Sequence, residues 1–260
     1  MYKSKNFLER STTKLYYQKP FLKSCQARIV KIVGNKIELN QTVAYPEGGG
    51  QEGDKGYIKT SEGIIIKFID TQKAYGRPIY LDDFPSIKVE TIIHHIVSND
   101  DLDALETIKE NDLVQVSIDV ERREKLSISH SASHLVFVGV GEVRPEAIKN
   151  VKGCHIKESS ARFDFSISER FEVDEIEKIK TFANEMVLKN YGISSYCHAG
   201  EPEALYWEAN GHVIPCGGTH LTETSLIGDI NLKRKGMGKN SERLIIKFPN
   251  ANVDVSKYHD

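Results

Sequence analysis

The chain has 260 residues, of which 39% are hydrophobic and 28% are charged, and its formal net charge is −2. This length allows one large domain or two modest ones, and the composition is that of a soluble globular protein. No apolar run approaches the roughly 20 residues of a membrane-spanning helix, and the polar start lacks a signal-peptide core. The four cysteines have no disulfide-framework spacing, so we expect reduced thiols and a cytoplasmic location. The near-neutral charge does not exclude a nucleic-acid partner, because local patches matter more than totals.

The first half of the chain reads as a series of short strands. Residues 1–20 are polar and aromatic and predict a partly ordered lead-in. Residues 27–39, with Gly34-Asn35 at the centre, predict a β-hairpin. Further strand candidates follow at turn-punctuated intervals, at residues 64–69, 78–81, 91–97 and 113–120. Such spacing favours a small β-barrel over a helical or doubly wound domain.

A glycine-rich segment interrupts this series at residues 44–56, with Gly48, Gly49 and Gly50 followed by Gln51. Glycines free the backbone for unusual dihedral angles and for close approach to a neighbour. The segment is not a phosphate-binding P-loop, because no Lys-Ser/Thr pair ends it and no helix follows. It predicts either a flexible surface loop or an ordered loop between strands, and the strand-like residues 57–60 favour the second.

Residues 121–125 are densely charged and predict a connector that leads into a helix. In that helix His130 and His134 are spaced i and i+4, which places both imidazoles on one face. Ser127 and Ser129 are candidate caps for its start. The apolar residues Leu135, Val136 and Val138 support the helix, and Gly141 with Pro145 predicts its end.

A second pair with the same spacing, Cys216 and His220, lies much further along the chain. The intervening Gly217-Gly218 favours a turn rather than a helix. One thiolate and three imidazoles would complete a tetrahedral zinc shell. The pairs are too far apart in sequence to form a zinc finger, so a metal here would join a helix to a distant turn within a folded domain.

The remaining second half mixes helix and strand. Residues 173–190 show a helical period of apolar side chains, which predicts an amphipathic helix with a purely structural stripe. Strands are expected at residues 159–165, 211–214, 229–232 and 244–248, the second and third flanking the cysteine turn and the last closing the sheet.

The densest basic cluster in the chain is residues 233–239, which include Lys233, Arg234 and Lys235. A cluster of this kind is either a solvated hairpin tip or a site that binds a phosphate backbone. Charge alone favours neither of these two interpretations. Five other histidines have no paired spacing and are predicted to be structural, namely His94, His95, His198, His212 and His259, while His155 is left open.

Taken together, these stretches resemble the editing region of alanyl-tRNA synthetase and the freestanding editing proteins related to it, the AlaX family. The resemblance covers roughly residues 15–248, in order. It rests on several motifs, namely residues 45–51 with Asp54 and Gly56, residues 70–73, 130–135, 162–165, 216–220 and 222–224. Ser133 stands where a threonine is common, and Cys154 where a serine is common. No segment resembles the class II aminoacylation core or the long C-terminal module of the synthetase.

The resemblance implies an α+β fold, with a small N-terminal β-barrel at residues 1–120 and an α/β editing domain at residues 121–260. The editing domain would contain a mostly antiparallel sheet and one zinc ion. The implied reaction is ATP-independent hydrolysis of the ester that joins a wrong amino acid, chiefly serine, to the acceptor end of the tRNA for alanine.

The resemblance also implies roles for individual residues. His130, His134, Cys216 and His220 would hold the zinc, and the loop of Gly48, Gly49 and Gly50 would roof the pocket together with Gln51. Serine differs from alanine by a hydroxyl, so a pocket that prefers it must hydrogen-bond that group. Ser131 is the first candidate for this contact; the alternative is that it bonds the backbone of the preceding turn. Gln51 and Thr219 are the next candidates.

Two other functions remain open at this stage. The first is threonyl-type editing of seryl-tRNA for threonine, since the editing domain of threonyl-tRNA synthetase carries a similar histidine pair. The second is a non-catalytic module that binds tRNA or a synthetase, in which a zinc ion closed by four protein ligands is structural. The sequence gives no indication of the oligomeric state or of the general base.

Overall fold

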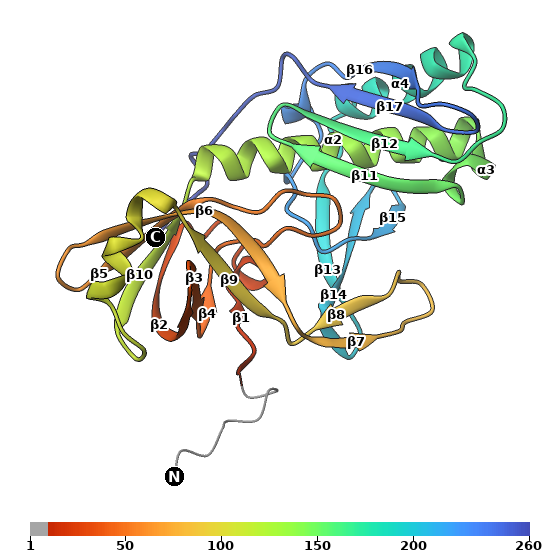
Figure 1. Cartoon of the computed structure of the whole chain (residues 1–260). Coiled ribbons are helices and arrows are strands. Elements are labelled where there is room, and N and C mark those ends of the chain that lie inside the picture. Colours follow the sequence, from red (N-terminus) through yellow and green to blue (C-terminus); the bar gives the residue numbers. More distant parts are fainter. Residues whose placement is uncertain (1–9) are drawn as a thin grey trace. The chain divides into compact units, whose positions relative to one another are not determined.

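The computed structural model describes residues 10–260, so the first part of the predicted lead-in lies outside the described residues. The chain forms two compact units (Figure 1). The first contains residues up to Gly48, Gly53–Arg123 and Val255–Asp260, and the second contains Gly49–Glu52 and Glu124–Asp254. The predicted boundary between residues 120 and 121 stays a prediction. None of the helices among residues 10–260 has the length and hydropathy needed to span a membrane.

The first unit is built around a closed barrel with the strand order β10-β2-β3-β9-β6-β5, and all neighbouring strands in it are antiparallel. Its elements are β1 (Thr13–Lys14), α1 (Leu15–Gln18), β2 (Ser24–Val33), β3 (Lys36–Leu39), β4 (Gln41–Thr42), β5 (Gly56–Thr60), β6 (Ile65–Ala74), β7 (Arg77–Ile79), β8 (Ile87–Val89), β9 (Ile92–Val97), η2 (Asn99–Asp101), η3 (Asp103–Thr107) and β10 (Leu113–Ile118).

Alternating side chains fill the interior of this barrel, among them the fully buried Ile37, Ile58 and Phe68. The predicted hairpin forms as β2 and β3, and the other strand candidates of this half correspond to β6, β7, β9 and β10. The glycine-rich segment is an ordered loop between β4 and β5. These expectations are confirmed.

The second unit contains two antiparallel sheets and the longer helices. Its elements are α2 (Val120–Val143, which begins in the first unit), α3 (Pro145–Ile148), β11 (Val151–Lys157), β12 (Ser160–Phe165), α4 (Val173–Leu188), β13 (Ile193–His198), β14 (Glu201–Ala209), β15 (His212–Pro215), η4 (Ser225–Ile227), β16 (Asn231–Gly236) and β17 (Glu242–Lys247). The sheet orders are β11-β12-β17-β16 and β13-β14-β15. With the barrel, this confirms the expected α+β class.

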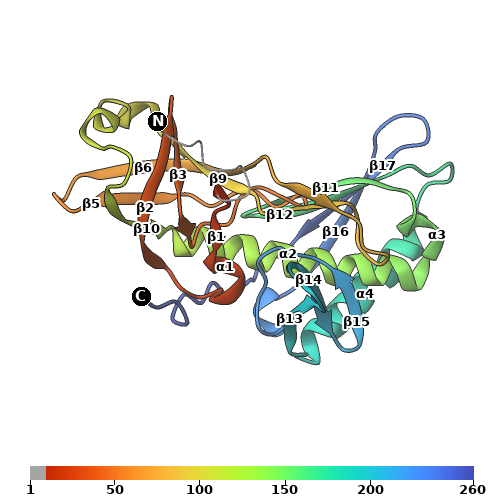
Figure 2. The ribbon, with the colours of Figure 1, turned by 90° about the horizontal axis from the view of Figure 1, so that it is seen from below.

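One core joins these layers. Apolar side chains of α2 and α4 pack with the inward residues of the four-stranded sheet, including Phe163, Phe165 and Leu244. Seen from below, the three-stranded sheet lies next to α2 (Figure 2), and Trp207 of β14 contacts His134 of α2, with ring centroids 4.9 Å apart. The amphipathic helix predicted at residues 173–190 is confirmed as α4, with Ile176, Ile179, Ala183, Met186 and Val187 buried.

The predicted start of the histidine helix was wrong. Helix α2 begins at Val120, so residues 121–125 are helical, and Ser127 and Ser129 are interior rather than caps. The Asp119 carboxylate instead accepts the backbone N–H of Arg122. Arg123 is buried because its guanidinium donates to Asp54, with Nε to oxygen distances of 3.0 and 3.1 Å, and to the carbonyl of Val43. A charged run suggests a solvated connector, but partners distant in sequence allow this one to be buried.

The strands expected at residues 211–214, 229–232 and 244–248 form as β15, β16 and β17, although β16 begins at Asn231 and extends to Gly236. The strand expected to close the sheet is β17, which lies between β12 and β16 instead of at the edge. The two strands expected to flank the cysteine turn, β15 and β16, belong to different sheets. Strands β11, β13 and β14 were not predicted, because their sequences carry Gly153, Pro202 and many polar residues in place of a clear alternation.

Candidate metal centre

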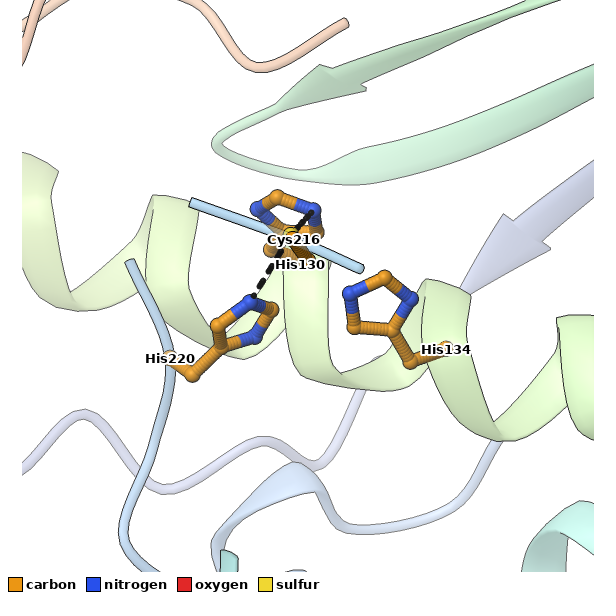
Figure 3. Close-up of side chains that lie close together, drawn as sticks. All are labelled: His130, His134, Cys216 and His220. Atoms are coloured by element: carbon orange, nitrogen blue, oxygen red, sulfur yellow. Dashed lines mark hydrogen bonds between the residues drawn. The ribbon is translucent and has the colours of Figure 1, made fainter. Parts of the chain in front are cut away.

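Four side chains of the second unit converge on one point (Figure 3). His130 and His134 project from adjacent turns of α2, and Cys216 and His220 come from the irregular segment that follows β15. Each residue offers one ligand atom, and these atoms all lie within 4.8 Å of one another. The structure therefore brings together the four residues that the two sequence pairs singled out, in an arrangement that could hold a metal ion.

The segment from Cys216 to His220 reaches the helix because of its glycines. A Cβ atom at Gly218 would overlap the imidazole of His130, so a larger residue would push the segment away from α2. As a result the ring of His220 lies with its centroid 4.3 Å from that of His130 and 4.8 Å from that of His134. No helix forms at Gly217-Gly218, as expected, and the irregular chain bends at Gly218.

Hydrogen bonds orient two of the three imidazoles. Nδ1 of His130 lies 2.8 Å from Oε1 of Gln51, and Nδ1 of His220 lies 3.4 Å from Oγ of Ser131. The Nε2 atoms of the same rings face Sγ of Cys216, at 3.4 and 3.3 Å. An amide oxygen can only accept, so Nδ1 of His130 carries the proton and its Nε2 has a free lone pair. Metal-binding histidines are commonly held through their second nitrogen in this way.

Burial keeps these histidines neutral. Burial lowers the pKa of His130 to about 3. It also lowers the pKa of His134 and His220 well below the usual value of histidine, with the neighbouring histidines adding to the effect. Among the described residues, Nε2 of His134 is a buried nitrogen without a hydrogen-bond partner. Neutral imidazoles, a cysteine sulfur and an unsatisfied nitrogen aimed at the same place are the donors that a zinc ion requires.

A second ring of polar contacts supports the ligands. The fully buried Gln51 accepts the backbone N–H of Thr219 at 3.0 Å and donates Nε2 to Oγ1 of the same threonine, also at 3.0 Å. Ser127 donates its hydroxyl to Oγ1 of Thr219 at 2.9 Å. Gln51 and Thr219, both expected near the pocket, therefore lie directly behind the ligands and hold His130 and the turn together.

The hydroxyl of Ser131 is also engaged. Its Oγ accepts the backbone N–H of Leu221 at 3.1 Å, besides its contact with His220. It therefore ties the Cys216–His220 segment to α2 rather than bonding the preceding turn of its own helix.

The three glycines of the loop have different surroundings. Gly48 belongs to the first unit and packs against Lys73, whereas Gly49 and Gly50 belong to the second. A Cβ atom at Gly50 would overlap Cys154, whose thiol donates to the carbonyl of Gly49 at 3.2 Å. The backbone of Gly50 and Glu52 exchanges hydrogen bonds with Ile156 of β11, so this stretch runs along the edge of the sheet.

The basic cluster lies elsewhere in the second unit. Lys233, Arg234 and Lys235 are part of strand β16 and not of a hairpin tip, and the connecting turn is residues 237–241. Lys233 and Lys235 are exposed on one face, whereas Arg234 points to the other face and donates to the buried Glu242 at 3.0 Å.

Sequence reasoning missed two residues near the ligands. Ser127 was assigned to a cap but contacts Thr219, and its position three residues before His130 on the same helix could have indicated this. Trp207, the one tryptophan of the chain, is fully buried with its ring against His134. A lone tryptophan in an unpredicted strand gives no comparable signal. His155, which was left open, forms an ion pair with Glu52.

Comparison with known proteins identifies the class of protein to which this chain belongs. Residues 207–244 match the family described as the threonyl and alanyl tRNA synthetase second additional domain. The alanyl-tRNA editing protein AlaX-M of Pyrococcus horikoshii is 30% identical over 242 residues, which cover 90% of this chain and 96% of the relative. The chain therefore belongs to the family of AlaX-like alanyl-tRNA editing proteins, as its motifs predicted.

Other relatives are full synthetases. The alanine–tRNA ligase of Sulfurisphaera tokodaii is 31% identical over 245 residues, and that of Pyrococcus furiosus is 30% identical over 262 residues. These alignments cover 85% and 93% of this chain but only 24% and 26% of the ligases. The chain thus spans about a quarter of the length of these ligases.

Proposed function

We propose that this protein hydrolyses mischarged tRNA for alanine, chiefly seryl-tRNA, at a single zinc ion. The observation that carries the proposal is the convergence of one thiol and three neutral imidazoles, with a buried nitrogen of His134 unsatisfied among them. The relative that this chain matches almost end to end is named as an alanyl-tRNA editing protein, which supports the substrate. On this proposal the second unit is the zinc-dependent editing domain, and the protein works in the cytoplasm, without ATP.

His130, His134, Cys216 and His220 would hold the metal. Three imidazoles and a thiolate suit zinc better than magnesium or calcium, which prefer oxygen ligands. When bound, zinc supplies Lewis acidity that can polarise the ester or lower the pKa of a water molecule. Four protein ligands fill a tetrahedral shell, so one of them would have to be weak enough to yield to the substrate or to water.

The residues behind the ligands have distinct proposed roles. Oε1 of Gln51 accepts a hydrogen bond from Nδ1–H of His130, which leaves Nε2 of His130 free to bind the metal. Ser131 does the same for His220: if Nε2 of His220 binds the metal, its Nδ1–H donates to Oγ of Ser131. Oγ then accepts two hydrogen bonds, and its own proton remains to be donated to the hydroxyl of a seryl group. Thr219 holds the turn in register through Gln51 and Ser127.

We propose that the glycine-rich loop roofs the pocket. Gly48, Gly49 and Gly50 would let the backbone approach the aminoacyl group, with Gln51 as the anchor of the loop. The small side chain of Cys154 supports this arrangement, since Gly50 lies against it without space for a Cβ atom.

The substrate would be held by its acceptor end, and Lys233, Arg234 and Lys235 of β16 are proposed to contribute to binding. A strand carrying three cations in sequence suits an anionic partner, although the ion pair of Arg234 with Glu242 makes it the weakest candidate of the three.

One alternative rests on the same geometry. A closed shell of one cysteine and three histidines is also typical of structural zinc, so the protein could bind tRNA or a synthetase without catalysis. The threonyl alternative is less favoured, because the relatives compared above carry alanyl names.

Incubating the protein with seryl-tRNA for alanine and following the loss of the ester tests the proposal. We expect hydrolysis of this substrate to be much faster than that of correctly charged alanyl-tRNA, and seryl-tRNA for threonine to be hydrolysed slowly. If seryl-tRNA for alanine is stable over the spontaneous rate while zinc is bound, the non-catalytic alternative is correct.

The role of Ser131 has its own test. Ser131→Ala removes the hydroxyl without adding volume at a position that is fully buried. A site that pairs a substrate hydroxyl can reject the analogue without it by about 10⁴-fold, so the preference for seryl over alanyl ester should fall by at least about tenfold. If both rates fall in the same proportion, Ser131 only positions His220, and Thr219→Val should be measured next.

A further inference from the structure

The outer face of the four-stranded sheet is strongly basic. Inward residues of its strands, such as Phe163 and Leu244, enter the core with α2 and α4. Because side chains alternate along a strand, their neighbours point to the opposite face. The cationic residues at these outward positions are Lys157 of β11, Arg162 of β12, Arg243 and Lys247 of β17, and Lys233 and Lys235 of β16.

The register sets these cations side by side across the sheet. One row contains His155, Arg162, Ile245 and Lys233, which are cross-strand partners in that order. The next row pairs Asp164 with Arg243, and Arg243 with Lys235. With strands about 4.8 Å apart, the rows extend for about 14 Å from β11 to β16.

Two acidic groups balance part of this charge, and one of them is Glu52, which forms an ion pair with His155 at the β11 edge. The four strands of this sheet place one carboxylate on the outer face, that of Asp164, since the other, Glu242, is buried on the inner side. Asp164 accepts from Nε and Nη2 of Arg243, at 2.6 and 3.0 Å, and also from Arg162. A guanidinium has five N–H groups, so each arginine keeps donors for a partner while Asp164 fixes its position.

Protection of a sheet edge does not explain the pattern. Lysines on an edge strand often prevent pairing with other chains, and Lys233 and Lys235 of β16 could serve that purpose. Arg162 and Arg243, however, lie on β12 and β17, which are interior strands paired with a neighbour on each side. An ordered cationic face that continues into the sheet complements a regular polyanion.

We propose that this outer face, defined by Arg162, Arg243, Lys233 and Lys235, binds the phosphate backbone of the tRNA whose ester is hydrolysed. The inference rests on the proposed function for the identity of the RNA. The sheet also connects with the ligand cluster: Gln51 bridges to Ile156 of β11 and contacts His130. The β11 edge of this sheet and the ligand cluster are thus joined through one residue.

The test compares two triple variants of the full chain. The first, Arg162→Gln with Lys233→Gln and Lys235→Gln, removes three charges from the outer face. The matched control, Lys178→Gln with Lys180→Gln and Lys189→Gln, removes three charges from α4 and the residue that follows it. Binding of uncharged tRNA for alanine is measured over a range of salt concentrations, and zinc content and circular dichroism establish that both variants are folded.

For the first variant we expect the slope of log affinity against log salt to become shallower by about 2 to 3, with at least about tenfold weaker binding near 0.15 M salt. The control should retain the slope of the unmodified protein. An unchanged slope in the first variant, or an equal change in both, would overturn the proposal. Because the probe carries no ester, binding can succeed while hydrolysis fails, so this test and that of the proposed function can fail independently.

Discussion

Buried histidines occur in two regions of the protein, and the hydrogen bonding of their ring nitrogens differs between the two. In the barrel, His95 is fully buried and both of its nitrogens have partners. Its Nδ1 lies 3.2 Å from the carbonyl of Ile37, and its Nε2 lies 2.8 Å from Oγ1 of Thr42. Since a carbonyl only accepts, Nδ1 donates and Nε2 accepts from the threonine, and the ring is complete without a ligand.

In the second unit the ligand histidines are incompletely bonded, although His130 and His134 are buried and His220 is partly buried. The Nε2 atoms of His130 and His220 face the sulfur of Cys216, and Nε2 of His134 has no hydrogen-bond partner within residues 10–260. An unsatisfied buried nitrogen costs free energy that a structural histidine avoids. Burial alone therefore does not identify a functional histidine, but the direction and occupancy of its second nitrogen do.

The largest effect is expected from removing a ligand. Cys216→Ala and His134→Ala should each reduce the bound zinc from one per chain to near zero and lower ester hydrolysis by at least about 10³-fold, because the remaining donors cannot complete the shell. Metal analysis of unstripped protein and a single-turnover deacylation assay provide the measurements. His95→Gln is the matched control and should keep its zinc; retention of full zinc in both ligand variants would contradict the site.

A smaller effect concerns acid stability in the barrel. Burial lowers the pKa of His95 to about 4 in the folded protein, against about 6.5 in an unfolded chain. Between these values the unfolded state takes up a proton that the folded state does not, so stability is lost as the pH falls from about 6.5 to 4. The difference corresponds to about 3 kcal/mol in the free energy of unfolding.

Urea unfolding of metal-free protein at several pH values measures this loss, and His95→Gln should abolish the corresponding part of it. The exposed His259 is a suitable control, since His259→Gln should leave the pH dependence unchanged. If His95→Gln loses stability as steeply as the unmodified protein below pH 6.5, the barrel histidine is not the source.

The smallest of the three effects concerns the support of the ligands. Gln51→Ala removes the acceptor that orients His130 and should weaken zinc binding by about 10- to 100-fold, as loss of such a partner does at other zinc sites. Competition with a chromophoric chelator gives the affinity. Thr219→Val removes the hydroxyl that contacts Nε2 of Gln51 but leaves the hydrogen bond between Gln51 and His130. The zinc affinity of this variant should therefore change by less than about threefold. Equal losses in both variants would assign the effect to the turn as a whole.

Much of the fold was accessible from local patterns. Short strand candidates at turn-punctuated intervals in the first half predicted strands of the barrel, and helical periodicity predicted α4 with its buried face. The start of α2 was not accessible, because the burial of Arg122 and Arg123 depends on Asp54 and Gly53, which no local pattern connects to them. Strand β14 was missed because of its local sequence. Its glutamates and its proline are unusual in strands, although one face of β14 packs in the core.

The candidate site also contains residues that the sequence indicated and residues that only the tertiary structure reveals. The i, i+4 spacing placed His130 and His134 on one helical face, but only the tertiary structure brings Cys216 and His220 to them. The family motifs indicated Gln51 and Thr219, while the bond from Ser127 required the fold. The different direction of Arg234 follows from strand alternation, which was not applied because the predicted strand ended at residue 232. The catalytic and substrate-binding roles stay predictions.

The path of residues 49–52 has a consequence for dissecting the protein. This stretch lies between two barrel segments in the sequence but is counted with the second unit, where Gln51 contacts a ligand histidine. A fragment that begins at residue 124 would contain all four ligand residues and still lack the amide that orients His130. Expressing the second unit by itself would therefore require grafting a glutamine-bearing strand onto the edge of β11. A swap of barrels between homologues would exchange part of the candidate metal site as well.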